Sequence, residues 1–547
     1  MIRRWFATKV GYHDPNFKTN QLILSVLKST ATRREAKDYI SKYGKPGVLN
    51  HCIIYMRDVS SYSQGLIQDL TATIGRLQML GVSPVVVLSP SPNVTKECND
   101  LRGFLHNYGL KSVPVSNCMS WKENGDVSVK IPELSAVMPI ILPFIYDEKL
   151  GKTVMVHNKT SFMSQLVSHI PYHIEKFFII NELGGIPSVE RHQKSHVFVN
   201  LSQEYELLAE QLQKQISDID ALSSLSHTET VETVINRDKL LARKQQLLKH
   251  KEDLEMMNAV LTQLSHPSTG LVTNVSSAAV HSKKNPLLHN VLTDRSLISS
   301  SLPSFKRRDI LHNHAWYELP DTTTKEEPAS SNEPIFSTTV LKQGVDIKVY
   351  NHSTLTPQNT IGLAPDEFET PLNEKIPTGD KLDLYKIRRV IEKSFGRSLN
   401  LEHYLKRING HIASIIVIGE YEGIAILTHE GPEGRKFAYL DKFAVLPHLR
   451  GSLCISDIIF NLMFKKFPHE LLWRSKRDNI VNKWYFQRSV AVMDLSLNLG
   501  DGDEKNSMFK LFYYGDRDKE TFENLNRLKE YAVCIRDIQP SWNDEVT

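Results

Sequence analysis

A strand, a turn and a helix in the second half of the sequence limit the fold more than any other stretch. Residues 437–445 (Phe-Ala-Tyr-Leu-Asp-Lys-Phe-Ala-Val) are rich in β-forming side chains, and residues 446–451 contain Pro447 and Gly451 as breakers. Apolar side chains then recur at helical spacing in residues 452–460. This order predicts a strand that leads directly into a helix. The unpaired N–H groups and positive dipole end of such a helix form an anion site that suits a pyrophosphate.

Motifs in and around this stretch resemble known protein families. The turn His448-Leu-Arg-Gly-Ser-Leu453 resembles the acetyl-CoA-binding turn of the GNAT acetyltransferase superfamily, Gln/Arg-x-x-Gly-x-Gly/Ala, although its first position is His and its last is Leu. Taken alone, this turn fits an ordinary strand-turn-helix equally well. A sharper resemblance, to the acetyltransferase domain of N-acetylglutamate synthases, comes from three further motifs. These are Tyr439-Leu-Asp-Lys-Phe443, Trp473-Arg-Ser475, and Asn479 followed by Trp484-Tyr-Phe486.

The bulk composition excludes several classes of protein. A chain of 547 residues is too long for one core, so we expect at least two domains. The formal charge of +4 is small for this length and gives no nucleic-acid footprint. Five Cys without a C-x-x-C pair argue against zinc or a disulfide framework, and no metal site is predicted. The longest apolar run, residues 136–146, is too short for membrane insertion.

The N-terminal residues have the composition of a mitochondrial transit peptide. Residues 1–9 combine three basic side chains with Ile2, Trp5 and Phe6 and contain no acid. Mitochondrial import recognises a basic amphipathic helix, so residues 1–45 are predicted as a transit peptide and disordered leader. This prediction places the protein in the mitochondrial matrix. A basic N-terminus without a targeting role is the alternative.

Residues 46–355 read as an α/β domain in which short apolar runs alternate with helical patterns. The runs lie at residues 52–56, 84–88, 177–180 and 196–200, and the helical patterns at 64–80 and 94–108. Such alternation predicts a parallel sheet covered on both faces. Residues 258–264, 285–294 and 299–303 resemble the amino-acid-kinase domain that precedes the acetyltransferase in the same synthase family. That resemblance implies an amino-acid-kinase-like regulatory domain that senses arginine.

We do not expect this domain to be a kinase. An active amino-acid kinase follows its first strand with a glycine-rich loop, because phosphate approaches backbone N–H groups closely only where no Cβ intervenes. Here residues 56–60 read Met-Arg-Asp-Val-Ser, with no glycine before Gly65. The pair Gly184-Gly185 follows a later strand, where a simple turn explains it. The predicted domain keeps the fold and an effector pocket without the phosphate chemistry.

Two stretches of this domain have the composition of insertions. Residues 217–230 are rich in Ser, Asp and His and lead into a charged helical pattern at 231–264. A solvated helical hairpin is the favoured interpretation, with a coiled coil or partner contact as the alternative. Residues 321–333 contain several acids with Thr and Ser, which predicts a disordered surface loop.

A linker and a second domain follow. Residues 356–380 hold four prolines and little periodic apolar content, which predicts the linker. Residues 381–395 have the apolar spacing of an amphipathic helix, and residues 412–419 and 423–428 predict a hairpin. Together with the strand-turn-helix, this order is the one that an acetyltransferase needs. Residues 381–547 are therefore predicted as a mixed-sheet GNAT acetyltransferase domain.

The resemblance to the synthases implies substrate-binding roles for Lys442 and Arg474. Glutamate carries two carboxylates, and these two cations stand at the ends of strands that we expect to be neighbours. Arg grips a carboxylate with two parallel hydrogen bonds, whereas Lys acts as a point charge. The alternatives are an edge-strand lysine that blocks aggregation and an arginine in a surface salt bridge.

The same resemblance implies catalytic roles for Tyr485 and Asn479. A Tyr hydroxyl can protonate the departing CoA thiolate because its reference pKa, about 10, lies above that of a thiol, about 8.5. A side-chain amide can orient the substrate or stabilise negative charge on the reacting carbonyl. Residues 484–486 are otherwise explained as core aromatics. No general base stands out, and water can take the proton of an α-amine.

Acetyl-CoA is the expected cosubstrate, and no permanently bound cofactor is predicted. By resemblance it contacts Phe443, Val445, Arg450, Gly451 and Ser452. The whole resemblance covers residues 48–540 and identifies the chain as a member of the N-acetylglutamate synthase family, of the fungal type. It implies acetyl transfer to the α-amine of L-glutamate at the head of arginine biosynthesis, with arginine as a feedback effector. A homo-oligomer and a complex with acetylglutamate kinase are implied as well.

Two other functions stay open at this point. The first is a non-catalytic regulatory subunit that binds the next enzyme of the arginine pathway, which Leu453 in place of the second turn glycine favours. The second is a bifunctional synthase-kinase, against which the missing glycine loop argues.

Overall fold

The computed structural model describes the chain in segments. The described residues are 39–40, 50–122, 127–131, 137–189, 194–225, 231–265, 267–281, 285–302, 337–356, 360–362, 381–449, 455–497, 499, 507–515 and 525–543. The predicted loop at 321–333, and most of the predicted leader and linker, lie outside them. None of the described helices is both long enough and apolar enough to cross a membrane.

The chain divides into two compact units. The first consists of residues 1–299 and 328–344, and the second of residues 300–327 and 345–547. The boundary expected at residue 355 is therefore too late. The reason is that β13 (Ile347–Tyr350) pairs antiparallel with β16 (Ile412–Ile418) of the second unit.

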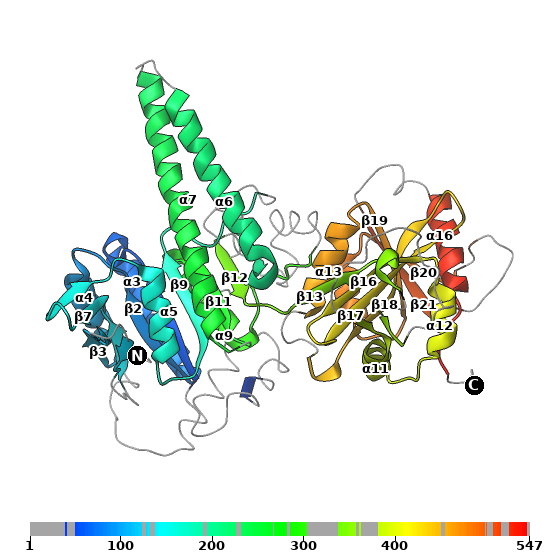
Figure 1. The fold of residues 1–547 in the computed structure, drawn as a ribbon, viewed down its shortest axis with the longest axis horizontal. Coiled ribbons are helices and arrows are strands. Elements are labelled where there is room, and N and C mark those ends of the chain that lie inside the picture. Colours follow the sequence, from blue (N-terminus) through cyan, green and yellow to red (C-terminus); the bar gives the residue numbers. More distant parts are fainter. Residues whose placement is uncertain are drawn as a thin grey trace, which may run out of the picture. The chain divides into compact units, whose positions relative to one another are not determined.

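An eight-stranded sheet forms the centre of the first unit (Figure 1). Its order is β10-β12-β11-β9-β1-β2-β6-β3, and among these strands only β11 and β12 pair antiparallel. The strands are β1 (Asn50–Met56), β2 (Val82–Leu88), β3 (Ser112–Val115), β6 (Met138–Ile141), β9 (Ile174–Asn181), β10 (Phe198–Asn200), β11 (Thr269–Asn274) and β12 (Thr338–Lys342). The four apolar runs predicted as strands are β1, β2, β9 and β10. The parallel-rich α/β class is confirmed.

Both faces of this sheet are covered, as a buried parallel sheet requires. The helices around it are α3 (Gln64–Met79), α4 (Val94–Asn107), α5 (Lys159–His169), α8 (Val275–Ala278) and α9 (Pro286–Thr293). Successive residues of β1 point to opposite faces, so Ile53 lies in a core with α5, whereas Ile54 lies in a core with α3 and α4. A smaller sheet, which the sequence did not reveal, has the order β5-β4-β7-β8. Its strands are β4 (Met119–Trp121), β5 (Val127–Val129), β7 (Phe144–Asp147) and β8 (Lys152–Met155).

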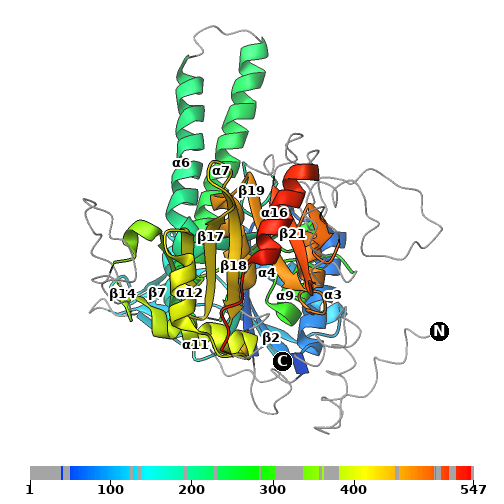
Figure 2. The ribbon, with the colours of Figure 1, turned by 90° about the vertical axis from the view of Figure 1, so that its right-hand side faces the viewer.

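The predicted insertion is a long helical hairpin made of α6 (Leu201–Leu225) and α7 (Val231–Gln263). Figures 1 and 2 show the two helices side by side, extending beyond the sheet of the first unit. The interpretation of a wholly solvated hairpin is wrong for its base. Leu247, Leu254 and Val260 of α7 are buried in the same core as α5 and the sheet. The second half of α7 is therefore a core element of the first unit.

The second unit is built on a mixed seven-stranded sheet of order β13-β16-β17-β18-β19-β21-β20. Its further strands are β17 (Gly423–Glu430), β18 (Phe437–Val445), β19 (Glu470–Lys476), β20 (Ala491–Asp494) and β21 (Phe509–Gly515). Its helices are α11 (Leu384–Phe395), α12 (Leu401–Ile408), α13 (Ile455–Lys466), α14 (Asn482–Arg488) and α16 (Leu525–Asp537). The predicted hairpin is β16 and β17, and the predicted signature strand is β18.

Local sequence explains where α11 starts and stops. Asp383 accepts hydrogen bonds from the main-chain N–H groups of Tyr385 and Lys386, which makes it the N-cap, so the helix begins three residues after the predicted start. At the other end, Gly396 has a φ of 68°, the left-handed conformation that commonly ends a helix. Between these ends, Leu384, Ile387 and Ile391 are buried as the spacing predicted.

Tyr39 lies in the segment predicted as a leader, yet it belongs to the core of the first unit. Its ring is buried among residues of that core, and its hydroxyl donates to the carbonyl of Leu80 at 2.8 Å. This contact contradicts the disorder predicted for Tyr39, whereas the cleavage point remains a prediction.

Candidate active site

A bulge in β18 sets the direction of the residues around the signature motif. The pairing of β18 with β17 joins Ile426 to Lys442 and Leu427 to Leu440, so Asp441 is an extra residue without a cross-strand partner. A bulge bends the strand and re-aims side chains. As a result, the consecutive residues Asp441 and Lys442 both contact Tyr404 of α12 instead of alternating between the faces.

The strands β18 and β19 pair over a short distance only. Their parallel register joins Tyr439 to Leu472 and Leu440 to Trp473 and goes no further, although β18 continues to Val445 and β19 to Lys476. Beyond Leu440, no strand among the described residues pairs with β18 on the β19 side. Phe443 and Val445, two of the predicted acetyl-CoA contacts, lie in this part of β18, which pairs with β17 on its other side.

The turn and helix after β18 have the predicted order. A short 3-10 turn, Pro447–Leu449, follows the strand, and α13 follows the turn. The predicted acetyl-CoA contacts Arg450, Gly451 and Ser452 lie outside the described residues. The anion site at this turn remains a prediction. Within the described part, the N-terminal end of α13 lies directly downstream of it.

Lys442 is a largely buried cation in a polar cluster. Its Nζ lies 2.9 Å from Oδ2 of Asp441, 4.8 Å from the centre of the Tyr404 ring and 5.8 Å from that of Trp542. Burial lowers the pKa of Lys442, and the charge of Asp441 opposes that shift. The lysine can donate further hydrogen bonds because an ammonium carries three protons.

Asp441 joins the other members of this cluster. Its carboxylate accepts hydrogen bonds from the Tyr404 hydroxyl at 2.8 Å, from Lys442 and from the guanidinium of Arg407. Burial alone would raise the pKa of Asp441, but Lys442 and Arg407 bring it down to about 2. Arg407 also pairs with Glu430 at 3.3 Å. The charges of this cluster therefore compensate one another.

Arg474 has a structural role that the sequence did not predict. Its two terminal nitrogens donate to the main-chain carbonyls of Ile535 at 2.6 Å and Ile538 at 2.8 Å, and its guanidinium lies over the ring of Phe509. Cations at a helix C-terminus stabilise the unpaired carbonyls and the negative dipole end. Arg474 thus caps α16, and its grip on a substrate carboxylate remains a prediction.

Tyr485 lies in α14 among aromatic rings. The rings of Trp473, Phe460 and Phe512 surround it, with centroid distances of 5.7, 6.0 and 5.4 Å. Burial raises the pKa of the Tyr485 hydroxyl, which therefore keeps its proton at neutral pH. That state is required of a proton donor. The interpretation of Tyr485 as a core aromatic describes its ring, and it leaves the role of the hydroxyl open.

Asn479 lies in the exposed turn between β19 and α14. Its Nδ2 donates to the Ser475 hydroxyl at 2.9 Å, and its side-chain oxygen accepts from the N–H of Val481. Asn482, which the sequence did not single out, is buried and donates to the carbonyls of Lys476 and Arg477. The two asparagines tie α14 to the end of β19. Neither is the N-cap of α14, which is Val481 without a side-chain cap bond, so no capping signal in the sequence pointed to Asn482.

The structure separates the predicted residues onto the two faces of the sheet. Lys442 lies opposite Ile426, whose core includes α11 and α12. Phe443 points the other way, because its ring stacks on that of Trp484 in α14 with an interplanar angle of 3°. Lys442 and the helix of Tyr485 therefore lie on opposite faces, at the point where β18 leaves β19.

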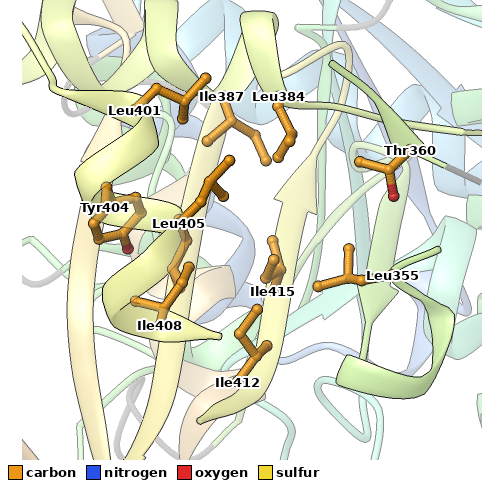
Figure 3. Close-up of a pocket in the computed structure, with 11 residues that line it drawn as sticks. Leu355, Thr360, Leu384, Ile387, Leu401, Tyr404, Leu405, Ile408, Ile412 and Ile415 are labelled. Carbon is orange, nitrogen blue, oxygen red and sulfur yellow. The ribbon is translucent and has the colours of Figure 1, made fainter. Parts of the chain in front are cut away.

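A small cavity in the second unit is not part of this arrangement. Figure 3 shows side chains of α11, α12 and β16 around a cavity of about 10 Å³. Its lining is aliphatic except for Thr360 and Tyr404. Without a lining cation, this cavity suits neither glutamate nor a pyrophosphate. It is a packing space between the helices and the sheet.

The first sheet has no glycine loop after β1, as the sequence indicated. Arg57 takes that position, and its buried guanidinium pairs with Asp253 and Glu252 of α7, each at 2.6 Å. The Gly184-Gly185 pair forms a turn, in which the side chain of Asn181 accepts from the Gly184 N–H at 2.6 Å. Carboxylates of α7 thus lie beside the end of β1, where phosphate oxygens would be repelled.

Comparison with known proteins agrees with the acetyltransferase geometry. The N-acetyltransferase domain of N-acetylglutamate synthase matches residues 371–538. The mitochondrial amino-acid acetyltransferase of Eremothecium gossypii is 53% identical over 548 residues, covering 99% of this chain and 99% of that protein. The protein of the same name from Kluyveromyces lactis is 48% identical over 552 residues, covering 99% and 100%.

Among solved structures, the aspartate kinase from Synechocystis matches part of this chain. The match covers 29% of this chain and 34% of the kinase chain. The TM-score is 0.24 and the sequence identity 14%, which is too weak to carry an argument.

The parting of β18 from β19 after Leu440, together with the domain match, defines the second unit as an N-acetyltransferase. Relatives this similar over nearly the whole chain then decide the family. The chain belongs to the family of mitochondrial amino-acid acetyltransferases. It is a mitochondrial acyltransferase, and acetyl-CoA is its cosubstrate.

The Asp441 cluster predicts a specific loss of stability in acid. Because the pKa of Asp441 falls from 3.8 to about 2 on folding, its ionised form stabilises the fold fully above about pH 4. This contribution, about 2 kcal/mol, is lost as the pH falls towards 2. In urea unfolding at a series of pH values, the stability difference between wild type and Asp441→Asn should shrink over this range. A difference that stays constant over this range would contradict the assignment.

Proposed function

We propose that the second unit transfers the acetyl group of acetyl-CoA to the α-amine of L-glutamate at the point where β18 and β19 part. One observation carries this proposal. Where the two strands part, Lys442 lies on one face of the sheet, and Phe443 stacks on the helix of Tyr485 on the other. An acceptor bound on the first face and a thioester reaching in from the second would meet between the strands.

The proposed chemistry needs few groups from the protein. The neutral amine of glutamate attacks the thioester carbonyl, and the C–S bond breaks as the new C–N bond forms. The attacked product carries a protonated nitrogen, which loses its proton to water. The thiolate takes the proton of the Tyr485 hydroxyl, and water then returns a proton to Tyr485. The buried site keeps Tyr485 protonated until the thiolate departs. Asn479 is proposed to orient the reacting carbonyl with the amide proton that Ser475 does not use.

Recognition of glutamate is proposed to rest on Lys442 and Arg474. Lys442 retains donors beyond the one used by Asp441, and it lies under the rings of Tyr404 and Trp542, which exclude water from its charge. Arg474 already serves α16, so its contribution to substrate binding is proposed as a long-range charge. The charge of Arg474 lowers the pKa of Lys442, although burial and the charge of Arg407 lower it more. Phe443 and Val445, with Arg450, Gly451 and Ser452, are proposed to contact acetyl-CoA.

An assay of the purified protein with glutamate and acetyl-CoA tests the proposal. Release of free thiol that depends on glutamate supports the synthase. A protein that binds acetyl-CoA but releases no thiol would favour the alternative, a regulatory subunit that binds the next enzyme of the pathway. The alternative bifunctional synthase-kinase is disfavoured because Asp253 and Glu252 already neutralise Arg57 after β1.

The first unit is proposed to sense arginine as a feedback effector. This rests on the resemblance to the synthase family and on a covered α/β sheet that has lost the phosphate loop of a kinase. A homo-oligomer and a complex with acetylglutamate kinase are proposed on the same resemblance.

Replacement of Tyr485 by Phe should lower kcat by about 100-fold, because only the proton donor is removed. The KM for glutamate should change less than about twofold, since the ring packing is kept. Steady-state kinetics at neutral pH measure both. Tyr385→Phe, which removes an exposed hydroxyl from α11, is the control. An unchanged kcat would remove Tyr485 from the mechanism.

Replacement of Lys442 by Ala should raise the KM for glutamate far more than that for acetyl-CoA, because a substrate carboxylate loses its partner at a cost of about 1–3 kcal/mol. The fold should survive because Asp441 keeps Tyr404 and Arg407 as partners. The exposed Lys476→Ala in the neighbouring strand is the control. Equal rises in both KM values would show a structural role. Arg474→Ala should show the same split, together with a lower melting temperature because α16 loses its cap.

Binding of arginine to the first unit should stabilise the full-length protein. A ligand that binds only the folded form contributes roughly 2.7 kcal/mol at a hundredfold excess over its Kd. The melting temperature should rise with L-arginine and stay constant with lysine or ornithine. Hydrogen exchange should then slow in residues 50–299. Protection confined to residues 381–543 would place the effector in the wrong unit for this proposal.

A further inference from the structure

A buried arginine joins two helices of the acetyltransferase unit to the chain segment that enters it. Arg488, the last residue of α14, is 1% exposed. Its Nε donates to the Ser301 hydroxyl at 2.7 Å, and its Nη2 to Oδ1 of Asp457 at 2.9 Å. Its Nη1 donates to the carbonyl of Trp484 at 3.1 Å. Each guanidinium nitrogen therefore has a partner, which a buried cation requires.

The same guanidinium fixes the ring of Trp484. Its central carbon lies 3.4 Å from the centre of that ring. Trp484 in turn stacks on Phe443 of β18 and meets the edge of Phe460 of α13. Since Tyr485 follows Trp484 in the same turn of α14, the position of its hydroxyl depends on how Arg488 holds this helix.

Asp457 brings α13 into the same cluster. It lies in the first turn of α13, where the helix dipole favours a carboxylate. An anionic cosubstrate bound at this helix end would be repelled by an unpaired carboxylate. Arg488 and Ser301 both donate to Asp457, which balances that charge. The cluster therefore also bears on acetyl-CoA.

Ser301 comes from far away in the sequence. It is fully buried and lies two residues beyond Ser299, the last residue of the first unit in this part of the chain. Its hydroxyl accepts from Arg488 and donates to Asp457, so both of its hydrogen-bonding roles are used. Upstream, Asp294 is bonded to Lys176 of β9 in the first unit. Only a short covalent stretch separates that contact from Ser301.

We propose that Ser301 is a positioning residue through which the segment leaving the first unit holds α13 and α14 in the geometry for acetyl transfer. The hydroxyl orients Arg488 and Asp457 together, and Arg488 orients Trp484 and hence Tyr485. A change in the first unit that moves this segment would alter catalysis without touching the substrates. This inference rests on the proposed function, which gives Tyr485 its role. It goes beyond that function by adding Ser301 and a connection from the first unit to α13 and α14.

The test compares Ser301→Ala with Ser296→Ala in the full-length protein. Ser296 lies in the same segment, and its hydroxyl donates only to the Ile298 carbonyl, so Ser296→Ala should behave as wild type. Ser301→Ala should lower kcat about threefold to tenfold and weaken acetyl-CoA binding, measured by calorimetry, by a similar factor. The KM for glutamate should change less than twofold. The melting temperature should fall slightly, because the Nε of Arg488 loses its partner while its other two nitrogens keep theirs.

A second variant separates positioning from general packing. Arg488→Lys keeps the charge beside Asp457 but cannot reach Ser301, Asp457 and the Trp484 carbonyl together, so its kcat should fall at least as far as that of Ser301→Ala. The double variant should then lose little more than Arg488→Lys alone, because both act through one contact. Additive losses, or a Ser301→Ala protein that matches Ser296→Ala in kcat and in acetyl-CoA binding, would overturn the proposal.

L-Arginine serves as the probe for transmission from the first unit. If arginine changes kcat in wild type, Ser301→Ala should lose most of that change while keeping the arginine-induced shift in melting temperature. A full response in Ser301→Ala would overturn the route through Ser301. A wild type that ignores arginine would instead refute the arginine proposal, and the acetyl-CoA binding comparison would still decide whether Ser301 positions α13. If glutamate is not the acceptor, the same binding comparison decides.

Discussion

The bulge at Asp441 is the feature on which the second unit depends most. Without the extra residue, Asp441 and Lys442 would point to opposite faces, and one charged side chain would lie among the aromatic rings around Phe460 and Trp473. With it, both charges reach the polar cluster of α12, and Phe443 is left to stack on α14. One inserted residue thus separates the charged side of the sheet, with Lys442, from the apolar side that holds Tyr485.

Both units bury charges, and in both a long-range partner makes that burial tolerable. In the second unit, Asp441 needs Arg407 of α12. In the first, Arg57 after β1 needs Asp253 of α7. Removing one partner of such a pair typically costs 3–5 kcal/mol, because the remaining charge stays buried. The α6–α7 hairpin therefore does more than extend from the domain. Its base lies beside the carboxyl end of β1, where an active kinase would hold phosphate.

Much of the fold was predictable because its signals are local. Apolar runs between breakers located β1, β2, β9 and β10, and helical spacing located α3, α4 and α11. The residues of β18 and of the β19–α14 turn were also found, since each motif is continuous in sequence. The small sheet β5-β4-β7-β8 was missed, because strands of three or four residues carry too little periodicity. The unit boundary was misplaced, because β13 is recognised as part of the second sheet only through its pairing with β16.

By itself, the sequence determined the α/β class of the first unit and the strand-turn-helix of the second, because those signals lie within single elements. It also located the residues that we propose for acetyl transfer. Only the tertiary structure decided what these residues do with their polar atoms. Arg474 was expected to face a substrate, and the structure adds that it caps α16, whose end lies some sixty residues later in the chain. Arg488 had no signal at all, since its partners Ser301 and Asp457 come from separate segments. Such contacts depend on which face of the sheet a side chain reaches and on which distant segments of the chain meet there. No local pattern of side chains encodes either.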